Sequence, residues 1–171
     1  MKYTILKNWH YAFFLFGRLF GWGYNKKKHV ITFKFSKECW WNPPRNQDDY
    51  DLNKLAGISF GLLGIHKNSV RLTWKPKFEK EGILELYGYV FDSSQKYHMS
   101  KYICDVKTDN EYVCILSFRE SDYLFDMWPF GSITMENKTI DNKLQKIVYP
   151  YFGGNNKSPR KMYFWVKTKK G

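Results

Sequence analysis

Seven polar or aromatic residues in three stretches of this sequence have side chains suited to binding a ligand. They are His66, Asn68, Arg71, Tyr87, Tyr89, Tyr149 and Tyr151. The first three lie in a polar loop and the alternating segment that follows it. The tyrosines of each pair are two residues apart, so in an extended strand both members point to the same side.

If these stretches are neighbouring strands, one sheet face carries Arg71 and the four tyrosines. Tyrosine rings can stack on sugar faces, while an arginine or asparagine bonds hydroxyl and carboxylate groups. The same set could stack nucleic-acid bases beside phosphate-binding lysines. A structural alternative stays open, in which the tyrosines simply pack the second sheet of the fold.

Short alternating runs must position these residues. In one of them Ile31, Phe33 and Phe35 share a face, which is typical of a half-buried strand. The strand-like runs are residues 2–7, 29–36, 54–60, 69–75, 82–91, 111–119, 123–127, 146–152 and 161–168. Only residues 48–55 and 141–147 suggest short helices. About ten strands with little helix predict an all-β, single-domain β-sandwich of the jelly-roll type over residues 1–171.

The composition agrees with a β protein that has an anionic partner. Aromatic residues make up 20% of the 171 residues, and alanine occurs only at Ala12 and Ala56. Rings favour strands, whereas a helical bundle uses alanine more often. The formal net charge of +12 indicates an acidic glycan, nucleic acid, membrane surface or acidic protein as partner. The alternative is that the charge only keeps an aromatic-rich protein in solution.

The sequence contains no motif for a metal or cofactor. HExxH, Walker A and GxSxG patterns are absent, and no cysteine pair has CxxC spacing. The four histidines are scattered, and we expect each in a surface or loop position: His10, His29, His66 and His98. We therefore expect no cofactor and no metal.

The apolar run at residues 11–24 is neither a membrane span nor a convincing signal peptide. It is interrupted by Arg18 and is shorter than the roughly 20 residues that a span needs. No small-residue cleavage site follows it. We expect no membrane span, and a cytoplasmic or virion-associated protein rather than a secreted one.

Three segments together carry a family resemblance: NKLAGISFG at residues 53–61, HKNSVRLTW at 66–74 and YPYFGGNNKSP at 149–159. With them, residues 28–167 resemble a family of small jelly-roll proteins of Bacteroidota and their phages. That family is similar in plan to concanavalin-like lectin and glucanase sandwiches. The resemblance implies the sandwich fold, and likeness at this level carries no activity with it.

Polysaccharide lyases of similar plan need an arginine for the uronate carboxylate, an assisting histidine or glutamine, and a tyrosine as base and acid. Arg71, His66 and Tyr151 could supply these groups. However, the sequence around Tyr151 does not reproduce the lyase strand, and Glu85 lacks the second acid on its strand that a glycoside hydrolase would use.

We therefore expect a non-catalytic binding or structural module, such as a virion component. Its partner would be an acidic glycan or a protein in a larger assembly. The alternatives are a polysaccharide-degrading enzyme of the lyase kind and a nucleic-acid-binding protein, although no RRM, OB or helix-turn-helix signature supports the latter.

Overall fold

The computed structural model describes residues 1–13, 22–24, 26–42, 44–60, 68–92, 97–136, 144–153 and 155–171. The strands are β1 (Lys2–Ile5), β2 (Ala12–Phe13), β3 (Trp22–Tyr24), β4 (Lys28–Phe35), β5 (Asn53–Phe60), β6 (Ser69–Pro76), β7 (Ile83–Asp92), β8 (Tyr97–Lys107), β9 (Glu111–Phe118), β10 (Asp122–Met127), β11 (Gly131–Glu136), β12 (Leu144–Val148) and β13 (Met162–Lys170). Two 3₁₀ turns, η2 (Lys37–Cys39) and η3 (Gln47–Tyr50), are also present. In the described part of the chain, no helix is long and apolar enough to cross a membrane.

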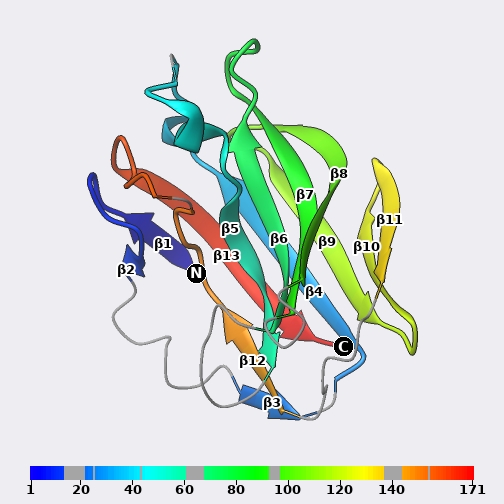
Figure 1. Cartoon of the computed structure of the whole chain (residues 1–171). Helices are drawn as coiled ribbons and strands as arrows, with labels where there is room; N and C mark the ends of the chain where they lie inside the picture. The colour runs from blue at the N-terminus through cyan, green and yellow to red at the C-terminus, as the bar shows by residue number, and fades with distance from the viewer. Residues whose placement is uncertain are drawn as a thin grey trace.

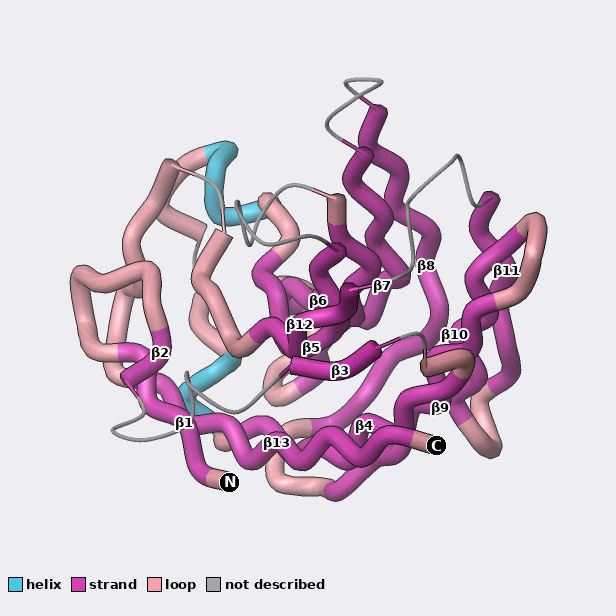
Figure 2. Tube along the Cα trace, turned by 90° about the horizontal axis from the view of Figure 1, so that it is seen from below, coloured by secondary structure: helices cyan, strands magenta, loops and turns pink. Residues whose placement is uncertain are grey.

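The strands form two antiparallel sheets that pack face to face. One has the order β11-β10-β9-β4-β13-β1-β2, and the other has the order β3-β12-β5-β6-β7-β8. The six-stranded sheet lies in front in Figure 1, and the end-on view separates the two layers (Figure 2). This arrangement confirms the predicted all-β jelly-roll sandwich.

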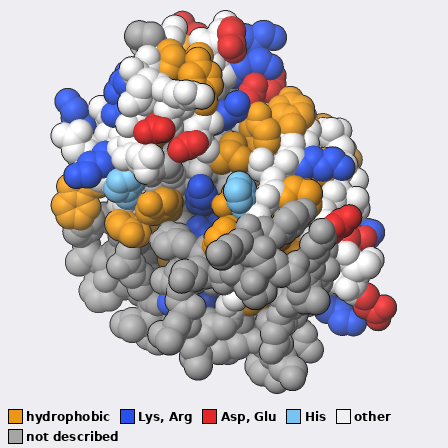
Figure 3. Space-filling view, viewed as in Figure 1, with side chains coloured by type: hydrophobic (Ala, Val, Ile, Leu, Met, Phe, Trp, Pro, Cys, Tyr) orange, Lys and Arg blue, Asp and Glu red, His pale blue; other side chains and the backbone are white. Residues whose placement is uncertain are grey.

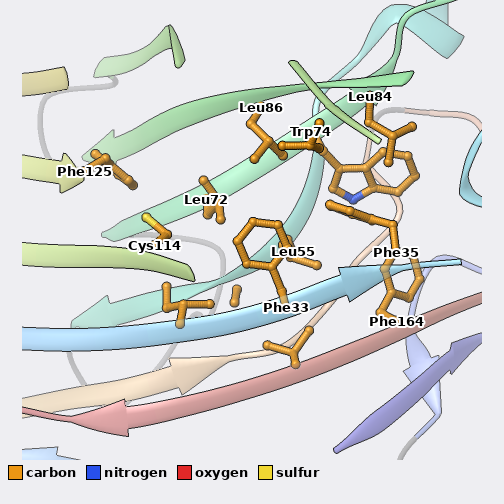
Figure 4. Packing of buried hydrophobic residues seen from close by; sticks show 14 of the residues in the cluster. Phe33, Phe35, Leu55, Leu72, Trp74, Leu84, Leu86, Cys114, Phe125 and Phe164 are labelled. Carbon is orange, nitrogen blue, oxygen red and sulfur yellow. The ribbon is translucent and has the colours of Figure 1, made fainter. Parts of the chain in front are cut away.

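An aromatic core fills the space between the sheets. Trp74 of β6 lies 5.2 Å from Phe35 and 5.8 Å from Phe164 between ring centroids, so one side chain joins the two sheets. Apolar side chains from both sheets converge around these rings (Figure 4). Tilted and edge-to-face rings at such distances add to the stabilisation that comes from burying their surface.

The alternation read from the sequence is confirmed in the central strands. Ile31, Phe33 and Phe35 of β4 point into the core. The helix expected at residues 48–55 is wrong, because η3 ends at Tyr50 and β5 begins at Asn53. Residues 144–147, also expected in a helix, form most of β12, since pairing with β3 and β5 outweighs local helix propensity. Residues 141–143 lie outside the described residues.

Trp74→Ala should lower the free energy of unfolding by about 3–5 kcal/mol, because it removes a large buried ring from between the sheets. Urea denaturation followed by circular dichroism measures this loss. Trp128→Ala is the matched control: its ring is 84% exposed, and its loss should change stability by no more than about 0.5 kcal/mol. Equal losses in the two variants would contradict this account of the core.

Candidate functional site

Arg71 lies at the centre of the outer face of the six-stranded sheet. In β6 it pairs with Gly57 of β5 on one side and with Tyr89 of β7 on the other. A Cβ on Gly57 would clash with the carbonyl oxygen of Val70 and lie 2.6 Å from the Arg71 Cα. Glycine at this position therefore lets β5 approach β6 closely beside the arginine.

The Arg71 guanidinium is almost fully buried, with 2% of the residue exposed. Its Nε donates a hydrogen bond to Ser69 Oγ at 3.0 Å. Burial lowers the pKa of Arg71 to about 10, while Tyr89 and Tyr151 act in the opposite direction. Arg71 thus keeps its charge at neutral pH inside a poorly solvated site.

A second cation, the half-buried Lys54 of β5, lies beside Arg71. Its Nζ donates to the carbonyl oxygen of Leu52 at 2.7 Å and lies 5.1 Å from the centroid of the Tyr89 ring. Burial, reinforced by the charge of Arg71, lowers the pKa of Lys54 to about 8. Among the described residues Lys54 forms no salt bridge. Two neighbouring cations in such a site favour an anionic ligand.

Tyr151 places a histidine next to these cations. Its backbone bonds to Lys54 in both directions at 2.8 Å, and its ring stacks on His10 with centroids 5.6 Å apart. His10 Nδ1 lies 3.0 Å from the carbonyl oxygen of Phe152, which can only accept, so Nδ1 carries the proton. The other ring nitrogen, Nε2, then has a lone pair that can accept a proton.

The structure brings together three of the residues expected from the sequence: Arg71, Tyr89 and Tyr151. It adds Lys54 and His10, which the sequence did not identify. We name these five the Arg71 cluster. On the face that contains it, Lys or Arg side chains lie near the middle, with a histidine on either side (Figure 3). His10 was expected only as a surface or loop residue, and its contact with Tyr151 joins segments 141 residues apart in the sequence.

Other candidate residues lie elsewhere. Tyr149 packs on the core residue Tyr3, with ring centroids 5.5 Å apart. This contact agrees with the alternative in which the tyrosines pack within the fold and do not line a binding face. Asn68 enters β6 in a left-handed conformation with φ of 54°, which asparagine tolerates well. Tyr87 belongs to a separate polar group described next. His66 lies outside the described residues.

Tyr87 bonds to one of two carboxylates that face each other across β7 and β8. Glu85 pairs directly with Asp105, so the second acid missing from the Glu85 strand is supplied by its neighbour. Each carboxylate contacts one lysine and one tyrosine hydroxyl: Lys75 at 3.3 Å and Tyr87 at 2.7 Å for Glu85, Lys77 at 2.7 Å and Tyr102 at 3.0 Å for Asp105. Both carboxylates therefore have a cationic and a hydroxyl partner within the sheet.

An ion pair between the buried Asp49 and the exposed Arg45 fixes the loop that follows Tyr151. Asp49 accepts hydrogen bonds from Arg45 at 2.6 and 3.0 Å and from Asn156 Nδ2 at 2.8 Å. Burial opposes the charge of Asp49, but the bonds from Arg45 outweigh it and hold the carboxyl pKa below its usual value. Because Arg45 also donates to the carbonyl oxygen of Lys157, the segment before β5 is tied to the segment after Tyr151.

A recess of about 380 Å³ lies on the opposite sheet and contains no member of the Arg71 cluster. It is lined by Trp128, Phe130 and the outer side chains of β9. Within the described ranges, no group of three or more His, Cys, Asp or Glu side chains is placed to hold a metal ion.

Comparison with known proteins finds the same fold in solved structures but no match to a sequence family. No family model matches the sequence, and no curated protein matches it significantly. Among solved structures, alginate lyase A1-II', a member of polysaccharide lyase family 7, superposes with a TM-score of 0.53 at 12% identity, over 86% of this chain and 63% of the lyase. The family 7 alginate lyase AlyA1 from Zobellia galactanivorans gives 0.53 at 12% identity, over 88% and 65%. A GH16 enzyme of the Bacteroides ovatus mixed-linkage glucan locus gives 0.55 at 9% identity, over 98% and 78%.

These likenesses are to β-sandwich structures and agree with the jelly-roll fold of this chain. This chain spans less than two thirds of the length of the two lyases. The sequence led us to expect a non-catalytic module. The comparison contradicts this expectation, because the matched structures are polysaccharide lyases and a glycoside hydrolase. They favour the alternative, a polysaccharide-degrading enzyme. Identity this low establishes the fold alone, so an activity for this chain is a proposal.

Asp49→Asn should lower the free energy of unfolding at neutral pH by about 1–2 kcal/mol, because it removes the buried charge that accepts the hydrogen bonds from Arg45. A carboxyl whose folded pKa is depressed contributes stability above its unfolded pKa, and that stability is lost as pH falls. The difference between variant and native protein should therefore shrink below about pH 4.

Urea unfolding over a series of pH values measures this difference. Asp48→Asn, one residue away and only half-buried, is the control and should have little effect. A stability difference for Asp49→Asn that does not change with pH would rule out an ionised, depressed Asp49.

Proposed function

We propose that this protein cleaves an acidic polysaccharide by β-elimination at the Arg71 cluster. The observation that carries the proposal is the pair of neighbouring cations, the buried Arg71 and the half-buried Lys54, beside Tyr151 and His10. A uronate carboxylate is the anion that suits two cations at a surface also lined by rings. The matched lyases act on alginate, which is consistent with an acidic polysaccharide here.

The chemistry follows from the charges. Arg71 and Lys54 neutralise the uronate carboxylate and stabilise the negative charge that develops when the C5 proton leaves. Nε2 of His10 accepts that proton. Burial raises the pKa of Tyr151, which keeps its phenol protonated, so it can donate to the departing glycosidic oxygen. The C4–O bond breaks as the C4–C5 double bond forms, and the proton on His10 then returns to the Tyr151 phenolate.

The contacts of the two carboxylates on this face argue against hydrolysis by paired acids. A glycoside hydrolase needs one protonated acid beside one ionised carboxylate. Glu85 and Asp105 each form a salt bridge with a lysine and accept a hydrogen bond from a tyrosine hydroxyl, so a glycosidic oxygen would have to compete with partners already present. Elimination requires no protonated carboxyl group.

We include two further expectations from the sequence in this proposal. One is membership of the small jelly-roll family of Bacteroidota and their phages, and the other is a cytoplasmic or virion-associated location. In that setting the substrate would be an acidic polysaccharide of a cell surface.

Arg71→Ala should reduce cleavage of the susceptible polyuronate by about a hundredfold or more, because it removes the charge that stabilises the transition state. The assay follows the ultraviolet absorbance of the unsaturated uronate over a panel of acidic and neutral polysaccharides. Lys101→Ala is the control: it removes an exposed cation outside the cluster and should leave the rate unchanged.

Two further pairs of variants separate elimination from hydrolysis. Glu85→Gln and Asp105→Asn should retain cleavage, whereas His10→Asn and Tyr151→Phe should lose most of it. New reducing ends without new absorbance, abolished by Glu85→Gln and unaffected by Arg71→Ala, would contradict the proposal in favour of hydrolysis. No cleavage of any polyuronate by the folded protein would also count against it.

Affinity for the polyuronate should fall as the pH rises through about 8, because Lys54 then loses its proton and the site loses one of its two charges. Lys54→Met should bind more weakly than the native protein at neutral pH. Its affinity should also stay flat between about pH 7 and 9, where the native protein weakens. Calorimetric titration with a short oligouronate across this range measures both curves. Parallel curves would show that Lys54 is not the titrating group.

A further inference from the structure

The outer face of the other sheet carries a regular alternation of lysines and aromatic rings. Lys2 of β1 lies between two rings of β13, with its Nζ 4.4 Å from the centroid of Tyr163 and 5.5 Å from that of Trp165. Lys161 flanks Tyr163 at 5.4 Å, and Lys34 of β4 flanks Trp165 at 5.6 Å. We call these five residues the lysine ladder.

Strand pairing accounts for the ladder. Lys2, Trp165 and Lys34 are direct register partners across β1, β13 and β4, so they stand in one row on one face. Tyr163 lies two residues before Trp165 on the same strand and therefore on the same side. Their neighbours Phe164 and Val166 point into the core, which leaves the ladder on the surface.

Charge is divided sharply across this sheet. The three strands β1, β4 and β13 contain no Asp or Glu, and they carry the lysines at positions 2, 28, 34, 167, 169 and 170. Strands β9, β10 and β11 of the same sheet contain no Lys or Arg and carry Glu111, Asp122, Asp126 and Glu136. The boundary falls between β4 and β9, where Lys34 is the register partner of Glu111, so a polyanion would be attracted mainly to β1 and β13 and repelled from β9, β10 and β11.

We propose that the lysine ladder is a second binding site, which holds a separate segment of an acidic polysaccharide on the sheet opposite the Arg71 cluster. The rings place the ammonium groups in a row by cation–π contact, so less side-chain freedom is lost when a line of carboxylates binds. A single-stranded nucleic acid fits less well, because bases need open ring faces on which to stack and lysines flank both rings.

This site goes beyond the proposed lyase activity and does not depend on it. The two sites lie on opposite faces of the sandwich, so one polymer-binding site can be removed while the other is measured. A chain held on the ladder would also keep polymer close to the protein between cleavage events, which raises its effective concentration at the cleavage site.

The test measures binding of a fluorescent oligouronate in the Arg71→Ala background, in which the first site is disabled. This protein should still bind. The added triple substitution Lys2→Gln, Lys34→Gln and Lys161→Gln should weaken the remaining binding by about tenfold, the sum of three exposed charge contacts. The matched control removes three exposed lysines elsewhere, Lys80, Lys101 and Lys107, and should change affinity by less than about twofold.

A fourth variant tests the role of the rings. Trp165→Leu leaves every charge in place but removes the ring that holds Lys2 and Lys34, and should weaken binding by about threefold. Thermal unfolding confirms that each variant is folded. Equal weakening in the ladder and control variants would overturn the proposal, as would loss of all oligouronate binding in Arg71→Ala alone. Tighter binding of an oligothymidylate than of the oligouronate would overturn it in favour of nucleic acid.

The two proposals fail in different ways. Absence of cleavage by a protein whose ladder still binds oligouronate would reject the lyase activity and leave the second site standing. If the native protein cleaves the polymer but the ladder variant binds oligouronate as tightly as the control variant, the second site is rejected and the lyase activity stands.

Discussion

The burial of the Arg71 charge is the constraint around which the outer face of the six-stranded sheet is arranged. An ionised group removed from water is costly unless nearby dipoles, rings and hydrogen bonds compensate. Ser69 supplies a hydrogen bond, and the rings of Tyr89 and Tyr151 stand beside the guanidinium. Lys54 then adds a second positive charge to the same site, which raises the cost further and depresses its own pKa. A bound carboxylate would relieve both costs at once.

The backbone around the Arg71 cluster leaves room for its two cationic side chains. Gly57 permits the close approach of β5 to β6 beside Arg71. Gly153 lies against Lys54, where a Cβ would come within 3.0 Å of the ammonium nitrogen. The buried Asp49 and its bonds to Arg45 and Asn156 hold the loop after Tyr151 in place. The GGNN sequence in this loop therefore has a physical explanation in part: one of its glycines gives the lysine room, and Asn156 bonds to a buried carboxylate.

The sequence was sufficient to predict the fold because the central strands are half-buried and alternate cleanly, as in β4 and β6. It was less informative at the edges. Strand β8 at Tyr97–Lys107 was not predicted, and its pattern is broken by the register shift opposite Leu86 and Tyr87. Arg71, Tyr89 and Tyr151 were identified because arginine and paired tyrosines at strand spacing are unusual. His10 and Lys54 were missed, since their roles depend on which strands become neighbours, and nothing in the local spacing encodes that.

The distribution of the +12 charge explains more than its size. Near Glu85 and Asp105, lysines are matched by carboxylates, and at the recess beside Trp128 the charged lining residues are acidic. Cations without a matching carboxylate on their own strands gather on β1, β13 and β4, while the buried Arg71 and the half-buried Lys54 lie together at the Arg71 cluster. A charge needed only for solubility would have no reason to separate from acids along one sheet, or to enter a poorly solvated site at the centre of the other. Both features are expected of a protein that binds a polyanion on two faces, with the Arg71–Lys54 pair suited to chemistry and the row of lysines suited to retention.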